Sequence, residues 1–426
     1  MATVTQLVSI RSTLVEDVLA YLHELSTRTA KLPRYYPKRL RTGTVGGTSF
    51  DEVRQMVQVV EDREALEHWL AEERERLHRA GQSDERRAYK PRKARPELAE
   101  PDSDAEGDRD DEPDMPVSIP WDEHAGRRFR RAVILGDPGF GKSWLLQWET
   151  RRLALEGKRQ LEQWKVSLDD LVLPILARCS ELNQSDDAVE DALVRLAGQD
   201  RTEEFRRWVL WKLRNGGCVV LLDAWDEVPL EPRQQGAPSR HAPNYRERLG
   251  QRLGRFGEEF PDLRMLLSSR IVGYGGSPVT DLVEVELVAW ETPQIESFVR
   301  VWFGPDGRKG SEFLDRLQRV GQVQGLARIP LMLALLCKAF ERKRLSLPTT
   351  RGKLYNECLR GLLGDWKGEE DGAERVSPAY IDAVLEVLCP VGLELFSEGH
   401  DQFGVSLLRT KLLTRLDGVA PKSRTP

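Results

Sequence analysis

The sequence predicts an α/β fold in which helices cover both faces of a parallel sheet. From residue 116 onward, short apolar runs alternate with stretches of helical spacing, the pattern of consecutive strand and helix units. The strand interiors at 219–222 and 265–267 are apolar at consecutive positions, which is typical of strands buried on both faces. After Val285 the pattern is helical throughout, so helical subdomains are expected behind the sheet.

The elements of the sheet region follow from where each apolar run begins and ends. Runs rich in Val, Leu and Ile indicate strands, and the longer stretches between them indicate helices. Such units are joined by right-handed crossovers. The expected strands are 132–135, 172–177, 218–223 and 264–268, and the expected helices are 143–156, those within 187–214, and 243–258.

Helix start signals recur after the sheet region. Thr350 can cap a helix that contains Leu354, and Ser377 with Pro378 supplies a cap and a first-turn proline. This part of the chain therefore indicates one or two helical subdomains. The expected helices are 292–303, 311–323, 330–342, 350–365, 378–398 and 405–416.

Residues 1–85 are expected to form a small, mainly helical leader that contains one strand. A capping box at Thr13 and Glu16 opens a helix with apolar residues at helical spacing. Residues 56–60 alternate weakly and favour a strand, whereas 64–79 favour a highly charged helix. The leader carries no recognisable catalytic group in its sequence.

Residues 86–115 have the composition of a disordered linker. They begin basic and become strongly acidic, with almost no apolar residue from which to build a core. A segment that docks onto a partner through its charge is the alternative.

The overall composition is that of a folded protein without a bias toward nucleic acid. The 426 residues are 40% hydrophobic, which is enough to bury a sizeable core. The 64 basic and 69 acidic residues give a net charge of -5, without the positive excess of a dedicated nucleic-acid binder. Binding to nucleic acid is therefore unsupported.

The chain is expected to be cytoplasmic. Arg11, Glu16 and Asp17 interrupt any apolar signal region near the N-terminus. The most apolar later run, 329–340, is too short to span a bilayer, so no membrane insertion is expected. The five cysteines are widely spaced, contain no C-x-x-C pair, and are expected to be buried free thiols.

A complete phosphate-binding loop lies directly after the expected strand 132–135 and directly before the expected helix 143–156. Its glycines allow successive backbone N–H groups to face a phosphate chain at a helix N-terminus. Lys142 supplies a positive charge to the outer phosphates, and Ser143 supplies a hydroxyl suited to Mg2+. A glycine-rich turn with an accidental Lys-Ser is the alternative. The expected nucleotide-binding residues are Gly136, Asp137, Pro138, Gly139, Phe140, Gly141, Lys142 and Ser143.

Three carboxylates follow the expected strand 218–223. Asp223 ends this strand, at the edge of a parallel sheet where ligands gather, and is expected to hold Mg2+ through water. Asp226 and Glu227 lie just beyond it and are expected, jointly, to orient or deprotonate an attacking water. The sequence does not choose between these two residues. A solvated acidic turn after a core strand is the alternative.

These motifs together resemble the NACHT family of signal-transduction NTPases, of the STAND class of P-loop signalling ATPases, in its bacterial form. The resemblance is carried by the loop 136–143, by Asp223-Ala224-Trp225-Asp226-Glu227, and by Leu266-Leu267-Ser268-Ser269-Arg270. In that family the acidic strand ends in Asp, a small residue, an apolar residue and then Asp-Glu. A later strand ends in Ser-Arg, which implies that Arg270 senses the terminal phosphate.

The resemblance covers most of the chain and implies its division into parts. A P-loop NTPase core is expected over 116–285, a helical subdomain over 286–365, and a partial winged-helix region over 366–426. Pro330 resembles the proline that packs against the nucleotide base in these ATPases, although a proline that only starts a core helix is the alternative. His400 lies too early to replace the winged-helix histidine that contacts nucleotide in the family.

The same resemblance implies a nucleotide-operated signalling switch that binds ATP with Mg2+ and hydrolyses it slowly. The resting protein would hold ADP, exchange for ATP would shift the helical subdomains, and hydrolysis would reset them. ATP is preferred over GTP on the same ground. Self-oligomerisation on activation, an unidentified protein trigger or effector, and a context in bacterial antiphage defence or regulation are further implications.

Two other classes of protein compete with the switch. One is a non-hydrolysing nucleotide-binding scaffold or a truncated remnant of a larger sensor, which the missing ligand-sensing repeats favour and the intact carboxylates oppose. The other is a mechanical or metabolic P-loop enzyme. The sequence has neither the Leu-Ser-Gly-Gly signature of transporter ATPases nor an Asn-Lys-x-Asp guanine-reading element, which argues against that class.

Overall fold

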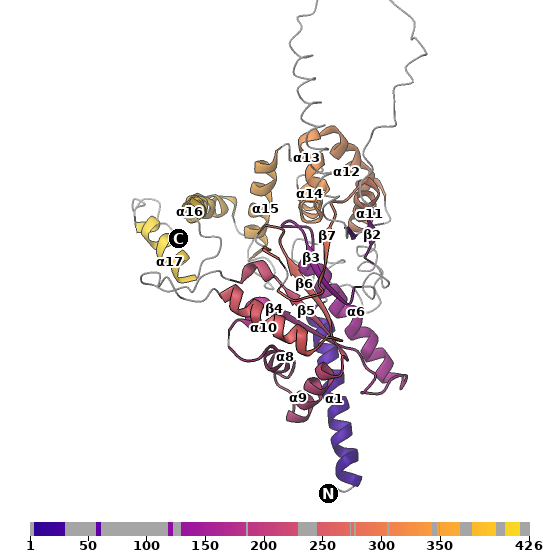
Figure 1. Ribbon diagram of the computed structural model, residues 1–426. Coiled ribbons are helices and arrows are strands. Elements are labelled where there is room, and N and C mark those ends of the chain that lie inside the picture. Colours follow the sequence, from indigo (N-terminus) through magenta and orange to yellow (C-terminus); the bar gives the residue numbers. More distant parts are fainter. Residues whose placement is uncertain are drawn as a thin grey trace, which may run out of the picture. The chain divides into compact units, whose positions relative to one another are not determined.

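The computed structural model (Figure 1) describes most of the core region and several separate segments around it. The helix expected at 64–79, the linker expected at 86–115 and His400 lie outside the described residues. The described ranges are 4–29, 57–60, 118–121, 129–184, 186–228, 245–272, 274–276, 278–304, 307–342, 347–348, 350–366, 377–397 and 405–417.

The chain divides into two compact units. The first comprises residues 1–314 and 325–334, and the second comprises 315–324 and 335–426. The first unit contains the sheet and every residue that lines the pocket described below.

A seven-stranded mixed sheet, mostly parallel, forms the centre of the first unit in the order β2-β1-β7-β3-β6-β5-β4. The strand β3 pairs in parallel with β6 and β7, and β5 pairs in parallel with β4 and β6. The strands are β1 (Gln58–Val60), β2 (Ile119–Pro120), β3 (Arg131–Leu135), β4 (Leu173–Arg178), β5 (Cys218–Asp223), β6 (Arg264–Ser269) and β7 (Val283–Leu287).

The expectation of a wholly parallel sheet is wrong at one edge. There β1 runs antiparallel to both β7 and β2, with Val59 opposite Leu287. The strand β7 itself was not expected, because the helical pattern was taken to begin at Val285. Its sequence alternates Val and Glu and then ends in Leu287, which is a period-two pattern typical of a strand. The strand expected at 56–60 is confirmed as β1.

The other expected strands and helices of the sheet region are confirmed, with shifted ends. The helix after the glycine-rich loop is longer than expected and extends to Glu162. The helices of this unit include α1 (Val4–Arg28), α6 (Lys142–Glu162), α7 (Cys179–Leu182), α8 (Val189–Ala197), α9 (Glu203–Arg214), the 3-10 turn η1 (Trp225–Glu227), α10 (Tyr245–Glu259) and α11 (Thr292–Phe303).

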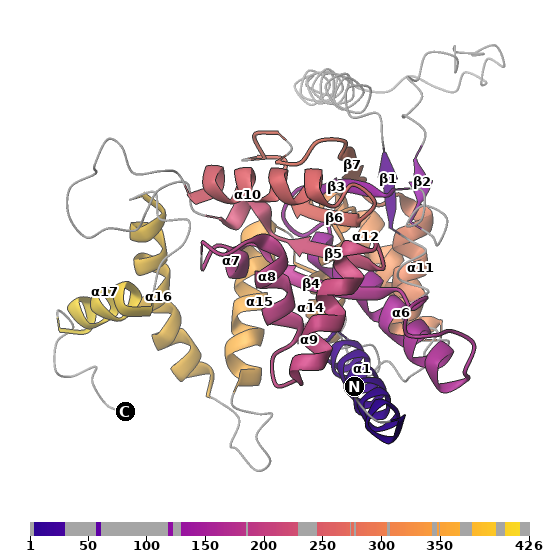
Figure 2. The same ribbon diagram turned by 60° about the horizontal axis from the view of Figure 1, so that its bottom comes forward.

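Both faces of the sheet are buried, as the apolar strand interiors predict. In β3, Val133 and Leu135 join one hydrophobic cluster, whereas Ala132 and Ile134 join the other. The first cluster includes apolar residues of α1, α8, α9 and α10, and the second includes Leu145 and other residues of the start of α6. Figure 2 shows these helices arranged around the strands. Because β3 side chains pack on both faces of the sheet, the strand that leads into the glycine-rich loop is held from both sides.

The helix α1 covers the edge strand β4 and is part of the sheet unit. The hydroxyl of buried Tyr21 donates a hydrogen bond of 2.9 Å to the carbonyl of Pro174 in β4. The Asp17 carboxylate accepts from the backbone N–H of Thr202 at the start of α9. In Figure 1, α1 lies beside α6 and α9. The helix is thus joined both to neighbouring helices and to the edge strand of the sheet.

The remaining helices follow α11. The helix expected at 311–323 is two helices instead, because the chain leaves helical geometry at Val320, whose N–H bonds to the carbonyl of Leu317 three residues back. The other expected helices are confirmed within a few residues. They are α12 (Arg308–Arg319), α13 (Gly321–Ala327), α14 (Pro330–Arg342), α15 (Arg351–Trp366), α16 (Pro378–Ser397) and α17 (Val405–Asp417).

The cysteines are free as expected, but the expectation that all five are buried is wrong for Cys358 and Cys389. All five thiols are free; Cys179, Cys218 and Cys337 are buried, Cys358 is half-buried and Cys389 is exposed. None of the helices in the described part of the chain is both long and apolar enough to cross a membrane.

The contact between α1 and β4 can be tested by changing Tyr21→Phe. This change keeps the buried ring but leaves the Pro174 carbonyl without its donor, so the free energy of unfolding should fall by about 1 kcal/mol. Thr27→Ala is the control, because its exposed hydroxyl bonds only within α1, to His23. Urea denaturation measures both changes, and an equal effect of the two variants would contradict this role of Tyr21.

Candidate functional site

The glycine-rich loop follows the carboxyl end of the central strand β3 and enters α6 at Lys142. Gly139 has φ 89° and Gly141 has φ 95°, a left-handed conformation that favours glycine. A β-carbon at Gly139 would also lie 3.1 Å from the β-carbon of Leu331. The Gly139 carbonyl accepts a hydrogen bond of 3.1 Å from the Leu331 N–H. The loop is therefore fixed against the start of α14 as well as against the sheet.

Lys142 folds back over this loop. Its Nζ donates to the carbonyls of Gly136 at 2.6 Å and Asp137 at 3.1 Å. Burial lowers the pKa of the Lys142 ammonium, and the nearby Asp226 carboxylate acts in the opposite direction. The first turn of α6 adds backbone N–H groups that have no partner within the helix. A cation and a helix N-terminus thus favour an anion at the same place.

Asp223 lies at the centre of a hydrogen-bond network that joins three elements. Its Oδ1 accepts from the hydroxyl of Ser143 in α6 at 2.9 Å and from the hydroxyl of Ser268 in β6 at 2.6 Å. The Ser268 oxygen in turn accepts from the backbone N–H of Ala224 at 2.9 Å. Asp223 and Ser268 are both buried, so the network is held in one geometry.

The strand order explains why these residues meet. Because β6 lies between β3 and β5, the carboxyl ends of all three strands lie side by side. The loop starting at Gly136 follows β3, Asp223 ends β5, and Arg270 follows β6. In parallel sheets this edge is where ligands bind.

The turn after β5 carries the next two carboxylates. Ala224 adopts a left-handed conformation with φ 62°, which directs the chain into the 3-10 turn η1. Asp226 accepts a hydrogen bond of 2.9 Å from the Arg270 N–H, and its other oxygen lies 3.0 Å from Arg270 Nε. Asp226 is therefore paired with the end of β6.

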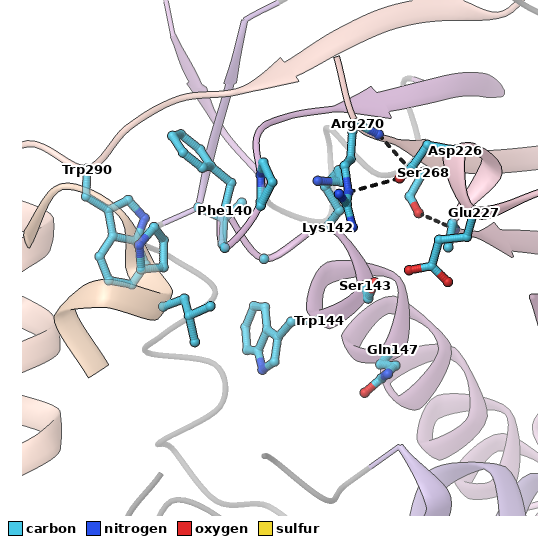
Figure 3. A pocket seen from close by; sticks show the side chains of 17 residues that line it. Phe140, Lys142, Ser143, Trp144, Gln147, Asp226, Glu227, Ser268, Arg270 and Trp290 are labelled. Atoms are coloured by element: carbon cyan, nitrogen blue, oxygen red, sulfur yellow. Dashed lines mark hydrogen bonds and ion pairs between the residues drawn. The ribbon is translucent and has the colours of Figure 1, made fainter. Parts of the chain in front are cut away.

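A pocket of about 340 Å³ opens over these groups. Figure 3 shows that it has two chemically different ends. Lys142, Asp226, Glu227 and Arg270 lie at the polar end, and Trp290 lies at the other. The apolar side chains of the lining belong to Val57, Pro138, Phe140, Trp144, Ala224, Trp290, Pro330 and Leu331.

Most of the residues expected at a nucleotide site line this one pocket. They are Pro138, Gly139, Phe140, Gly141, Lys142, Ser143, Asp226, Glu227, Arg270 and Pro330. Gly136, Asp137 and Asp223 do not line it. Gly136 is buried at the end of β3, Asp137 is exposed, and Asp223 is buried beside Ser143 and Ser268.

Several lining residues were not expected from the sequence. The sequence could have indicated Ser268, because it lies near the end of the strand that Arg270 follows. Trp144 directly follows the glycine-rich loop but matches no position of its pattern. Gln147 lies one helical turn after Ser143 in α6, so helical spacing from the motif could have indicated it. Val57 and Trp290 come from segments without a motif, and only the fold brings them to the pocket.

The oxygen atoms of Ser143 and Asp223 fit Mg2+. This ion prefers one or two protein oxygens together with water and phosphate oxygens, and these two side chains meet at 2.9 Å beside the pocket. Across the described residues, no group of three or more His, Cys, Asp or Glu side chains is arranged to hold a metal ion. The two residues therefore fit a metal that a bound phosphate helps to hold.

Comparisons with known proteins give no family for this chain. No protein-family profile matches it, and no curated protein shows significant similarity to it.

The network around Asp223 predicts a difference between two adjacent buried serines. Ser268→Ala removes a donor to Asp223 and the acceptor of the Ala224 N–H, so it should lower the free energy of unfolding by about 1–3 kcal/mol. Ser269→Ala is the matched control, since its hydroxyl bonds only to the adjacent Arg270 carbonyl. Urea denaturation should show the smaller loss for Ser269→Ala, and the reverse order would contradict the network.

Proposed function

We propose that this protein binds ATP with Mg2+, hydrolyses it slowly, and acts as a nucleotide-operated switch similar to the NACHT class of signalling ATPases. One observation carries the proposal. The pocket joins a phosphate-binding loop and a cluster of charged residues at one end to aromatic and apolar side chains at the other. A nucleoside triphosphate has the same two ends, a polyanionic chain and a flat base.

At the polar end, the loop binds the phosphate chain. Backbone N–H groups of the loop and of the first turn of α6 face the phosphates, and Lys142 neutralises the outer ones. Ser143 and Asp223 hold Mg2+, directly or through water, and the ion supplies charge neutralisation to the two outer phosphates. Because burial lowers the pKa of Lys142, a bound anion also stabilises a charge that the empty site disfavours.

Hydrolysis at this end requires an oriented water. The carboxylates that line this end are Asp226 and Glu227, and we propose that the water is oriented and its proton accepted from within this pair. The water oxygen bonds to the terminal phosphorus while the bond from that phosphorus to the bridging oxygen breaks. The products are ADP and inorganic phosphate, and the proton passes from the carboxylate to phosphate or solvent. Arg270 stabilises the charge on the terminal phosphate.

The apolar end suits an adenine base. Trp144 and Trp290 offer ring faces on which a base can stack, and Pro330 and Leu331 add apolar surface from the start of α14. The amide of Gln147, which can donate and accept hydrogen bonds, also lines the pocket. The preference for ATP over GTP therefore rests on the similarity to the NACHT class.

The switch follows from contacts that differ between ATP and ADP. The terminal phosphate adds interactions with Lys142, Mg2+ and Arg270, and a ligand can bias two states only through such differences. The Leu331 N–H bonds to the loop carbonyl of Gly139, so the loop and the beginning of α14 change together. We propose that α14 carries the nucleotide state to the helices that follow it.

The proposal is tested by ATP binding and phosphate release with Lys142→Ala. The wild-type chain should bind ATP with Mg2+ at micromolar concentration and release phosphate slowly. The variant should lose at least about 100-fold in affinity, because a charge-assisted interaction with the phosphates is lost. Lys158→Ala, in the same helix α6, changes a lysine that pairs with Glu162 and should leave binding unchanged.

Two results of this experiment would speak against parts of the proposal. Micromolar ATP affinity retained by Lys142→Ala would contradict binding at the glycine-rich loop. Tight binding of ATP without phosphate release would instead favour the non-hydrolysing scaffold.

The assignment of the two ends is tested by Trp144→Ala. Loss of a stacking surface should weaken ATP binding roughly tenfold, whereas binding of inorganic triphosphate, which has no base, should not change. Trp164→Ala is the control, since this side chain is 90% exposed beyond the far end of α6. Calorimetry measures both ligands, and an equal loss for ATP and triphosphate would contradict a base site beside Trp144.

A further inference from the structure

The two carboxylates after β5 occupy different environments. Both oxygens of Asp226 are engaged by one residue, since one accepts from the backbone N–H of Arg270 at 2.9 Å and the other lies 3.0 Å from its Nε. The Asp226 side chain is only 10% exposed, whereas the Arg270 side chain is 50% exposed. Asp226 is thus placed to hold an arginine rather than a water.

The backbone that carries Asp226 is fixed from outside the turn. Arg246 in α10 donates to the main-chain carbonyls of Asp226 at 2.6 Å and Val228 at 2.9 Å. The Ala224 N–H at the other end of the turn is held by the Ser268 hydroxyl. These bonds make the Asp226 carboxylate a rigid support.

The guanidinium of Arg270 contacts Asp226 at one edge. A guanidinium presents five N–H donors in a planar fork, and the ion pair with Asp226 uses the Nε side of it. The two terminal nitrogens extend beyond Nε and together can donate to a phosphate. Arg270 lines the pocket together with Lys142. Asp226 therefore fixes the direction in which the fork can face the phosphate end.

Glu227 faces the same pocket from a different side. In Figure 3 its carboxylate lies on the side of Ser143 and Gln147, away from Arg270. We propose that Asp226 is a positioning residue that aims Arg270 at the terminal phosphate, and that Glu227 alone orients the attacking water. The inference rests on the proposed function, because it assigns separate roles to two residues of that site.

The test measures how strongly each variant prefers ATP over ADP. A non-hydrolysable ATP analogue and ADP are titrated with Mg2+ into the full chain, and the ratio of the two dissociation constants is compared. Asp226→Asn and Arg270→Ala should each reduce the preference for the triphosphate roughly tenfold, because both remove the directed guanidinium. Glu227→Gln should keep the preference and lose phosphate release from ATP.

The double variant separates positioning from a direct contact. If Asp226 acts only through Arg270, Asp226→Asn combined with Arg270→Ala should lose no more preference than Arg270→Ala alone. The matched control is the surface pair Arg130 and Asp262, at the amino ends of β3 and β6. Asp262→Asn should leave both dissociation constants unchanged. If Asp226→Asn does not fold, Asp226→Glu replaces it, since the longer side chain keeps the charge but displaces the fork.

Each outcome decides between the alternatives. Equal losses of preference in the two single variants, with no further loss in the double variant, support the inference. If an Asp226 variant weakens the binding of ATP and ADP equally, Asp226 has only a structural role, and the inference is overturned. Losses of preference that multiply in the double variant would also overturn the inference. A wild-type chain that binds neither nucleotide would overturn the proposed function itself, and the inference with it.

Discussion

The pocket depends on the position of one buried carboxylate, Asp223. Burying a charge is costly unless hydrogen bonds compensate it, and here Ser143 and Ser268 provide them from two different elements. Because β6 separates β3 from β5, the carboxylate can reach the start of α6 and the end of β6 at once. The strand order and the hydrogen bonds therefore fix the same geometry.

The charges around Asp223 give the site its preference for anions. Lys142 and Arg270 are cations at the polar end, and the N-terminus of α6 adds its partial positive charge. Burial disfavours the charged form of Lys142, while the carboxylate of Asp226 favours it. The ammonium donates hydrogen bonds to two carbonyls of the loop. In the proposed complex, a phosphate would give this ammonium an anionic partner.

Much of the fold follows from the sequence because its signals are local. The apolar run before Gly136 and the glycines after it specify a strand, a loop and a helix within about ten residues. The strand β7 was missed because its alternation was read as the start of a helical region, and its partner β1 is more than 200 positions away. The segment is only five residues long, so its alternation alone does not identify the pairing partner.

Some residues of the candidate site can likewise be predicted from local sequence signals, and others cannot. The motif predicts Lys142 and Ser143, since the chemistry of a phosphate requires those residue types at that spacing. It does not predict Trp290, which lines the pocket. The backbone N–H of Trp290 bonds to the carbonyl of Arg328, and this holds Trp290 beside the start of α14. The sequence also leaves Asp226 and Glu227 equivalent, because spacing gives their distance along the chain and not the direction of their side chains.

The most direct test of this account is to identify the nucleotide that the purified chain retains. Denaturing the protein and separating the released small molecules by chromatography gives both its identity and its amount. A pocket with a half-buried lysine beside the Ser143 and Asp223 oxygens, used as we propose, predicts ADP or ATP, at up to one molecule per chain, either retained or taken up on incubation with ATP and Mg2+. A chain that retains no nucleotide and takes none up from ATP and Mg2+ would contradict it.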